Sequence, residues 1–405
     1  MKPSNSTEQA CASVRNVFDE DIEDNDEDSD PVIPKFQKKE LLVGELLGRG
    51  FFCNVSEIRG IFLELNDDDS DDEDSSECDE KQAIEMTISL DPKEENDCRR
   101  NSMAINYRRE SGDMEGGARY AIKELKPELV GRERYGAIKD LAIEARFLST
   151  IRHPNIIKMR GFADSSPTKD GYFIVLDRLY DTLEERIRKW RYQGDKIKFK
   201  CCLPSCRKID SLTSQLSIEK ISAAYDLASA LDHLHKRRIM HRDLKPDNIG
   251  FDIRNDLKLF DFGLGIQLRT DAKSSDVFKL TGCVGSLRYM APEVVRCQKY
   301  GMSADIYSFS LLFWEMLSTK LPFSGYNKVE HRDKVIVGNV RPELSRSWPA
   351  EWCSLMKKCW TSSLHERLSA NTLLNILGEE CHKICLAKSN GEARRKSSTS
   401  IMYGW

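Results

Sequence analysis

Residues 41–176 carry short apolar runs separated by glycines and polar residues, the pattern of β-strands. Residues 41–55 consist of an apolar run, a turn with Gly48 and Gly50, and a second apolar run, which predicts two strands joined by a tight turn. Residues 119–125 and 172–176 are two further strand-like runs. We therefore expect this part of the chain to be rich in strands.

Apolar stripes at spacings of three and four residues predict helices farther along. Ile138, Leu141, Ala145 and Leu148 form one stripe, and Glu144 lies beside it, where its side chain is expected to point inward. A second stripe predicts a long buried helix and consists of Ile218, Ile221, Leu227, Leu231 and Leu234. Residues 306–317 are apolar almost all round, as in a central buried helix, and are too short to span a bilayer.

Polar segments interrupt this pattern. Residues 1–39 are acidic with few large apolar side chains, so we expect them to be disordered. Residues 65–117, rich in acids, Ser and Asn, are expected to form a long flexible loop. Residues 193–216 follow the helical pattern of 182–191 as a second insertion, and residues 378–405 form a C-terminal tail.

Charge is strongly segregated along the chain. Residues 17–30 hold nine acids and residues 66–80 hold ten, with no Lys or Arg in either segment, and removing these nineteen acids changes the formal net charge from -4 to +15. We interpret this excess as ordinary solvated Lys and Arg on an enzyme surface, with attraction of acidic partners and phosphates as the alternative. No motif resembles a nucleic-acid-binding module. Thirteen irregularly spaced cysteines and an acidic N-terminus without a secretory leader predict reduced thiols in the cytoplasm, with the nucleus as an alternative.

The stretch from Ile239 to Asn248 gathers chemically useful groups in a short space. It places a carboxylate (Asp243), an ammonium (Lys245) and an amide (Asn248) within six residues, on a segment that a proline keeps from being helical. Phosphoryl transfer needs such a set, namely an acceptor for a hydroxyl, a cation for a phosphate oxygen and an oxygen ligand for Mg²⁺. The alternative is a turn that happens to be charged. Against it, Asp261 follows a strand-like run and supplies a second oxygen ligand.

These two motifs resemble the catalytic loop and the metal-binding Asp-Phe-Gly triplet of protein kinases. Residues 285–293, Gly-Ser-Leu-Arg-Tyr-Met-Ala-Pro-Glu, together with Cys359 and Trp360, look like the tyrosine-kinase-like group of serine/threonine kinases. The resemblance covers residues 40–377. It implies an α+β, two-lobed protein kinase fold, with a small antiparallel β lobe carrying one helix (about 40–176) and a larger, mainly α lobe (about 180–377).

The resemblance also implies an activity, the transfer of the γ-phosphoryl group of MgATP to Ser or Thr hydroxyls of protein substrates. Asp243 would orient the hydroxyl and accept its proton, and Lys245 would steady the transferring group. Asn248 and Asp261 would hold Mg²⁺, and Lys123, paired with Glu144, would position the phosphates. The other nucleotide-binding residues that the resemblance implies are Gly48, Gly50, Val55, Ala121, Asp177 and Leu179.

Three further matches to the family concern support of the site. By resemblance, Asp305 braces the catalytic loop, Ser286 orients the catalytic aspartate and lysine, and Glu293 forms a buried ion pair with Arg367. All of these expectations rest on position within the family's motifs.

Two departures from the family pattern keep a pseudokinase scaffold open as an alternative. Cys53 replaces the third glycine of the phosphate loop, and Gly250 stands where a large apolar residue usually forms the floor under the adenine. A dinucleotide-binding interpretation of the glycines would need a helix directly after them, whereas residues 51–58 look like a strand. A small-molecule kinase is disfavoured because such enzymes generally lack the Ala-Pro-Glu segment that ends at Glu293.

Arg242 suggests a switch that an upstream kinase would operate. An arginine at this position pairs, in the family, with a phosphorylated residue of the activation loop. The candidate hydroxyls are Ser274, Ser275 and Thr281, with Thr281 ranked first by its distance from the Ala-Pro-Glu segment. The alternative is that Arg242 binds a carboxylate such as Asp276 and the enzyme is constitutively active.

Overall fold

The structure is a computed structural model that describes residues 33–63, 92–111, 118–200, 207–269, 271 and 275–384. The chain divides into two compact units, which we call the N-terminal unit (residues 1–152 and 157–178) and the C-terminal unit (residues 153–156 and 179–405). Predictions for residues 1–32, for the acidic run 66–80 and for the end of the chain after residue 384 lie outside the described residues. Each unit is described by itself below.

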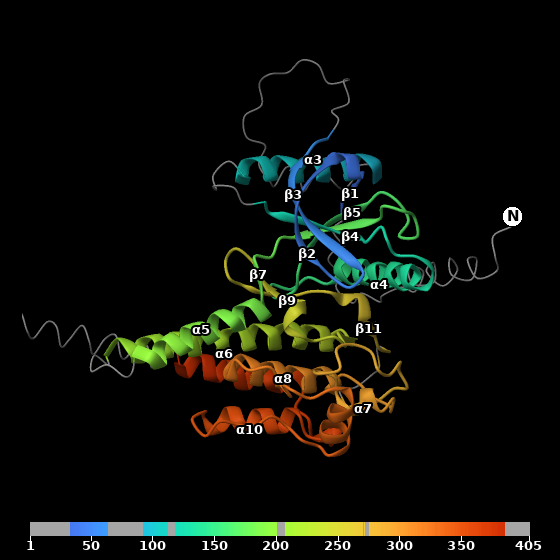
Figure 1. The fold of residues 1–405 in the computed structure, drawn as a ribbon. Coiled ribbons are helices and arrows are strands. Elements are labelled where there is room, and N and C mark those ends of the chain that lie inside the picture. Colours follow the sequence, from blue (N-terminus) through green and yellow to red (C-terminus); the bar gives the residue numbers. More distant parts are fainter. Residues whose placement is uncertain are drawn as a thin grey trace, which may run out of the picture. The chain divides into compact units, whose positions relative to one another are not determined.

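The N-terminal unit is built on a six-stranded sheet with the order β1-β5-β6-β4-β3-β2 (Figure 1). Neighbouring strands are antiparallel except β1 and β5, which are parallel. The apolar run 172–176 gives β6, whose residues 173–176 are all buried, as a fully apolar strand requires. The strands are β1 (Lys35–Phe36), β2 (Leu41–Arg49), β3 (Cys53–Ile61), β4 (Tyr120–Leu125), β5 (Met159–Ala163) and β6 (Phe173–Asp177).

Helix α4 (Gly131–Thr150) confirms the helix predicted from the first apolar stripe. Leu141, Ala145 and Leu148 are buried, and Glu144 is turned inward with them. The first strand, β1, and the 3-10 helix η1 (Lys38–Glu40) show that the expected disorder of residues 1–39 is wrong for residues 35–39, because Phe36 is buried and its strand pairs with β5.

Helix α3 (Pro92–Ser111) corrects a second expectation. It lies within residues 65–117, for which the sequence predicted a flexible loop, so the described residues of the N-terminal unit contain a second α-helix in addition to α4. Met103, Ala104 and Tyr107 are buried, and the helix packs against β1 and β3. The Tyr107 hydroxyl donates a hydrogen bond of 2.7 Å to the carbonyl of Ile58 in β3. Three buried residues make too small a stripe to be recognised among so many polar neighbours.

The C-terminal unit is mainly helical. Helices α5 (Leu183–Lys200), α6 (Arg207–Lys236), α8 (Ser303–Ser318) and α10 (Ala350–Cys359) pack in that order, each against the next (Figure 1). Residues 304–316 of α8 are all buried, which confirms the central helix predicted from 306–317. Residues 193–200 extend α5 and residues 207–216 open α6, so the described parts of the predicted insertion are helical extensions.

Short elements complete this unit. β10 (Leu257–Leu259), β9 (Ile249–Phe251) and β7 (Asp181–Thr182) form a three-stranded sheet, and β8 (Ile239–Met240) pairs with β11 (Ile266–Gln267). The remaining elements are η2 (Pro246–Asn248), η3 (Phe262–Leu264), α7 (Pro292–Val295), α9 (Lys328–Glu330), the π-helix η4 (His331–Val337), η5 (Leu364–Glu366) and a helix at 370–384.

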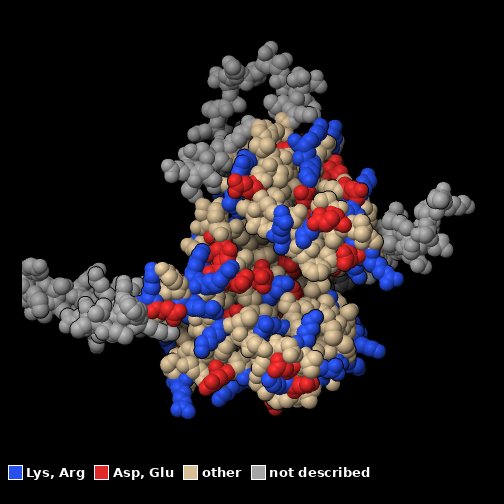
Figure 2. All heavy atoms as spheres, viewed as in Figure 1, with Lys and Arg blue, Asp and Glu red and all other residues tan. Residues whose placement is uncertain are grey.

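Lys and Arg side chains are spread over the face shown in Figure 2 and interspersed with Asp and Glu, rather than gathered into one patch. Within the described ranges, no helix combines the length and the apolar character needed to cross a membrane.

Candidate active site

In the C-terminal unit, the carboxylate of Asp243 is held by three hydrogen-bond donors. Its Oδ2 accepts from Lys245 Nζ at 2.8 Å and from Asn248 Nδ2 at 3.0 Å, and its Oδ1 accepts from the backbone N–H of Ser286 at 2.8 Å. Pro246 begins the single turn of η2, which returns Asn248 toward Asp243. The ammonium of Lys245 and the amide of Asn248 therefore both contact the carboxylate of Asp243, and this aspartate is buried.

Asp305, at the start of α8, braces this loop as the sequence predicted. Its two carboxylate oxygens accept hydrogen bonds of 3.0 Å from the backbone N–H groups of His241 and Arg242, and His235 Nε2 lies 3.1 Å from Oδ2. Burial alone would raise the pKa of Asp305, but the hydrogen bond and the electrostatic interaction with His235 lower it below its usual value. The brace matters because Arg242 has a φ of 66°, in the left-handed region that residues with a Cβ rarely adopt.

His241 joins the loop to the second motif. Asp243 N–H donates to Nδ1 of His241 at 3.3 Å, and the ring's Nε2 lies 3.0 Å from the carbonyl of Phe260. The same ring packs edge-on against Phe262 with centroids 4.9 Å apart. His241 thus fixes the backbone on both sides of Asp261, a role that the sequence motif did not reveal.

Asp261 and Asn248 are the predicted Mg²⁺ ligands, and they lie on adjacent segments of the chain. The amide nitrogen of Asn248 is engaged by Asp243, so its carbonyl oxygen is the atom that can face a cation. The backbone N–H of Phe260 donates to the backbone carbonyl of Asn248 at 3.0 Å, which keeps the two segments adjacent. A carboxylate and an amide oxygen suit a hard cation that takes its other ligands from phosphates and water. The described residues contain no cluster of three or more His, Cys, Asp or Glu residues that would hold a metal alone.

Gly285 is a site residue that the sequence analysis missed as an individual position. Its φ is +96°, and a Cβ there would lie 2.5 Å from the carbonyl oxygen of Arg242 and 3.2 Å from Oδ1 of Asp243. The absence of a side chain therefore lets the next residue, Ser286, bring its N–H to Asp243. The predicted contact of Ser286 with Asp243 is present, through the backbone N–H of Ser286.

Arg242 is engaged with backbone and hydroxyl groups. Its Nε donates to the carbonyl of Leu264 at 2.6 Å, and its Nη1 lies 3.4 Å from the hydroxyl of Tyr300, which in turn donates to the carbonyl of Thr281 at 2.6 Å. Thr281 and Ser275 have exposed side chains. Ser274 lies outside the described residues.

The predicted ion pair between Glu293 and Arg367 is present and buried. Arg367 Nη1 and Nη2 donate to the two carboxylate oxygens of Glu293 at 2.6 and 2.9 Å, and Nη1 also donates to the carbonyl of Ser303 at 3.1 Å. The two-pronged geometry and the additional hydrogen bond satisfy both charges, as a buried pair requires. The pair anchors α7, and with it the end of the segment that contains Ser286.

In the N-terminal unit, the predicted pair of Lys123 and Glu144 is also present. Lys123 Nζ lies 2.5 Å from Oε2 of Glu144, whose side chain is 1% exposed, so the inward-pointing Glu finds the cation that it needs. Val55 lies opposite Lys123 in the β3–β4 pairing, and Ala121 lies two residues before it in β4. These residues share one region of the sheet.

The glycine turn joins β2 to β3. Gly48 pairs with Val55 at the end of β2, and Gly50 N–H donates to the carbonyl of Cys53 at 2.8 Å. A Cβ at Gly48 would meet nothing within 4 Å, so the space beside this glycine is open to a ligand. Cys53 is the first residue of β3, and because β3 is a strand, the dinucleotide-binding interpretation, which needs a helix there, is wrong.

Asp177 ends β6 and makes contacts within the N-terminal unit. Its carboxylate accepts two hydrogen bonds from Arg160, at 2.7 and 3.1 Å, and its N–H donates to the carbonyl of Lys158 at 3.1 Å. Its side chain thus stabilises the sheet.

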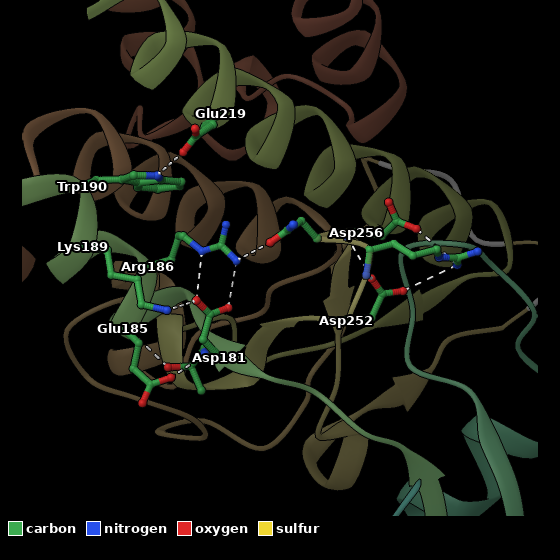
Figure 3. A network of polar contacts seen from close by, with 11 residues as sticks. Asp181, Glu185, Arg186, Lys189, Trp190, Glu219, Asp252 and Asp256 are labelled. Atoms are coloured by element: carbon green, nitrogen blue, oxygen red, sulfur yellow. Dashed lines mark hydrogen bonds and ion pairs between the residues drawn. The ribbon is translucent and has the colours of Figure 1, made fainter. Parts of the chain in front are cut away.

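The structure explains the glycine at position 250. A Cβ there would lie 2.6 Å from Cδ1 of Leu179 and 3.2 Å from the carbonyl oxygen of Asp181. Leu179, which was predicted as a nucleotide-binding residue, therefore occupies the space that a larger residue 250 would fill. Figure 3 shows the hydrogen bonds around Asp181 in this region. Its carboxylate accepts from Nε and Nη2 of Arg186, both at 3.0 Å, and from Nζ of Lys189 at 2.6 Å.

Comparison with known proteins identifies relatives of this chain. A family model described as "Protein kinase domain" matches residues 111–376. Three relatives from Arabidopsis thaliana are named serine/threonine-protein kinases. STY17 is 28% identical, and the match covers 64% of this chain and 40% of STY17. STY46 is 27% identical, and the match covers 70% of this chain and 43% of STY46. VIK is 30% identical, and the match covers 64% of this chain and 54% of VIK. This chain therefore spans about half, or less, of the length of these relatives.

Proposed function

The chain belongs to the protein kinase family, with relatives named serine/threonine-protein kinases, and from this premise we propose that it transfers the γ-phosphoryl group of ATP to serine and threonine hydroxyls of protein substrates. The observation that carries the proposal is the Asp243 carboxylate, held by Lys245, Asn248 and the N–H of Ser286. Domain boundaries at about 40 and 377 are part of the proposal, because β2 and β3 pair with β4 in one sheet although they precede the matched residues.

Asp243 acts as the acceptor for the substrate hydroxyl. A carboxylate offers about four lone-pair sites, and the three side-chain and backbone donors around Asp243 leave capacity for one more hydrogen bond. The carboxylate directs the hydroxyl oxygen toward the phosphorus and takes its proton as the new P–O bond forms. Because the donors fix the orientation of the carboxylate before the substrate arrives, little reorganisation is needed during the reaction.

Lys245 contributes the positive charge beside this carboxylate. An ammonium has three donors, and one of them is used on Asp243, so the others can contact oxygens of the transferring phosphoryl group. Asn248 and Asp261 would hold Mg²⁺, which when bound neutralises charge on the phosphates. In the N-terminal unit, Lys123, fixed by Glu144, would position the phosphates.

Gly48, Gly50, Val55, Ala121, Asp177 and Leu179 complete the proposed nucleotide-binding set. Open space beside Gly48 supports a close approach of phosphates to the backbone of the glycine turn. The contacts that Asp177 makes with its side chain and N–H leave its carbonyl as the hinge group for the adenine. Leu179, packed against Gly250, would supply apolar contact in place of the usual larger residue.

A pseudokinase scaffold is not supported. Its evidence was Cys53 and Gly250, and packing accounts for both, since Cys53 begins a strand and Gly250 accommodates Leu179. We further propose that an upstream kinase phosphorylates Thr281 and that the protein acts in the cytoplasm, where the seven free thiols among the described residues would remain reduced.

The test is phosphotransfer from radiolabelled ATP to a generic protein substrate by purified protein and its Asp261→Ala variant. We expect the variant to lose at least ~100-fold in turnover, because charge neutralisation supplies much of the barrier reduction. Asp256→Ala is the matched control, since that carboxylate is paired only on the surface with Arg254. Equal turnover of all three proteins would refute both the magnesium assignment and the enzyme proposal.

A further inference from the structure

The thiols of Cys283 and Cys297 lie close together in the C-terminal unit. Their sulfur atoms are 3.8 Å apart, and both residues are exposed. Cys283 lies between Thr281 and Gly285, and Cys297 follows α7. The backbone N–H groups of both cysteines donate to the carbonyl oxygen of Val294, at 3.0 and 3.1 Å, so the two stretches share one acceptor and are held together.

Gly282 shows how closely the two stretches approach. A Cβ on Gly282 would lie 2.8 Å from Cα and 2.9 Å from Cβ of Cys297, so a larger residue at 282 would push the stretches apart. The S–S bond of a disulfide is about 2.05 Å long, and the two sulfurs must therefore approach by less than about 2 Å. Rotation of the exposed side chains and a small backbone shift can provide this.

We propose that Cys283 and Cys297 are a redox-reactive pair, which hydrogen peroxide converts into an intramolecular disulfide that ties residues 281–286 to the end of α7. In a reducing compartment such a bond is transient and reports oxidant.

The chemistry balances with peroxide as the oxidant. The hydrogen bond with Cys297 raises the pKa of the Cys283 thiol, and we assign the first attack to Cys297. Its thiolate attacks one peroxide oxygen, the O–O bond breaks, and a sulfenic acid and hydroxide form. The sulfur of Cys283 then attacks the sulfenic sulfur, the S–O bond breaks and water leaves. Overall, two thiols and one peroxide give one disulfide and two waters, with two electrons passing from sulfur to oxygen.

The tied stretch contacts the candidate active site on both sides of Cys283. The carbonyl of Thr281 accepts from the Tyr300 hydroxyl, and the N–H of Ser286 donates to Asp243. Closing a ring between positions 283 and 297 in this arrangement restricts the other conformations of the segment, so oxidation retains the donor at Asp243. This effect on the donor rests on the proposed function, whereas formation of the disulfide does not.

The test treats the reduced full chain with a few molar equivalents of hydrogen peroxide, blocks remaining thiols with iodoacetamide and analyses peptides without reduction by mass spectrometry. We expect a cross-linked peptide pair joining Cys283 to Cys297, lighter than the two thiol peptides by two hydrogens and absent after dithiothreitol. Cys297→Ser should abolish the pair, and Cys353→Ser, a change at a half-buried thiol on α10, should leave it intact. The same result is expected in Asp243→Asn protein, which separates this test from the kinase proposal.

Hydrogen exchange supplies the second readout. Amides between positions 283 and 297 should exchange at least ~5-fold more slowly in the oxidised protein, and dithiothreitol should reverse the change. Absence of the cross-link, its formation only in urea, pairing of Cys283 with a different cysteine, or unchanged exchange in cross-linked protein would each overturn the proposal.

Discussion

Replacing Gly285 by alanine should damage catalysis far more than folding. The substitution places a Cβ 2.5 Å from the carbonyl oxygen of Arg242 and 3.2 Å from Oδ1 of Asp243. Ordinary contacts between nonbonded heavy atoms lie near ~3.5 Å, so the segment must retreat by about 1 Å. The hydrogen bond from Ser286 N–H to Asp243, now 2.8 Å long, then exceeds the length at which it stabilises the carboxylate.

The magnitude follows from that one bond. A hydrogen bond to a charged group contributes about 1.5–3 kcal/mol, which corresponds to a fall in kcat of roughly 10- to 100-fold if the contact is needed in the transition state. A positive φ in alanine adds a folding cost of about 1–2 kcal/mol. Gly325→Ala is the matched control, because Gly325 also has a positive φ, +85°, but a Cβ there meets nothing within 4 Å.

The assay compares kcat, KM and urea unfolding for the parent and both variants. Both glycine variants should lose similar stability from backbone strain, and only Gly285→Ala should lose kcat, with KM for ATP little changed. Should Gly285→Ala retain the kcat of Gly325→Ala, the N–H of Ser286 has no role in orienting Asp243, and the reasoning fails.

Three further predictions follow from other contacts. Asp305→Asn should leave unpaired one of the two buried backbone N–H groups that donate to its carboxylate, costing roughly 1–3 kcal/mol of unfolding free energy and lowering kcat; unchanged urea midpoint and kcat would exclude the brace. Thr281→Ala should abolish activation by phosphorylation while Ser275→Ala retains it, measured as activity before and after phosphatase treatment; full activity of phosphatase-treated parent would refute the switch. Burial raises the pKa of Glu315 to about 7, despite a 2.6 Å hydrogen bond from Tyr289, so stability that is full below pH ~4.5 is lost as pH rises to ~7. Glu315→Gln should remove most of this pH dependence of the urea midpoint, and an equally steep dependence in the variant would contradict the assignment.

Elements with long periodic stripes were predictable from the sequence. Helix α4 buries most of one face, and helix α8 buries nearly its whole surface. In both helices the apolar positions form a pattern that is recognisable in spite of the polar residues. Helix α3 is different, because Met103, Ala104 and Tyr107 are its buried apolar residues among those whose burial is described, and most of its other residues are polar. Its stability comes from tertiary contacts, including the hydrogen bond from Tyr107 to Ile58, and such contacts between distant residues leave no periodic signal.

The candidate site divides in the same way. Asp243, Lys245 and Asn248 are close in sequence, and a short loop must bring them together, so their residue types and spacing favoured phosphoryl transfer and the family resemblance implied their roles. Leu179 and Gly250 are 71 positions apart, and their complementarity appears only when β7 and β9 pair and the two residues are in contact. Gly250, where the family usually has a large apolar residue, thus leaves the space that the side chain of Leu179 occupies.

Backbone strain is the property of this site that sequence reasoning could least reach. Arg242, which precedes Asp243, and Asp261, the proposed Mg²⁺ ligand, both adopt φ values near +65°. This conformation costs a residue with a Cβ on the order of 1–3 kcal/mol. The identity of these two residues does not predict a positive φ at either position. The structure stabilises it from outside the motif, through hydrogen bonds from the backbone of the strained loop to Asp305 and through the ring of His241, which bonds to Phe260 and packs on Phe262. In the proposed mechanism the side chains of the motif supply the chemistry, and buried residues from distant elements hold the motif in its strained conformation.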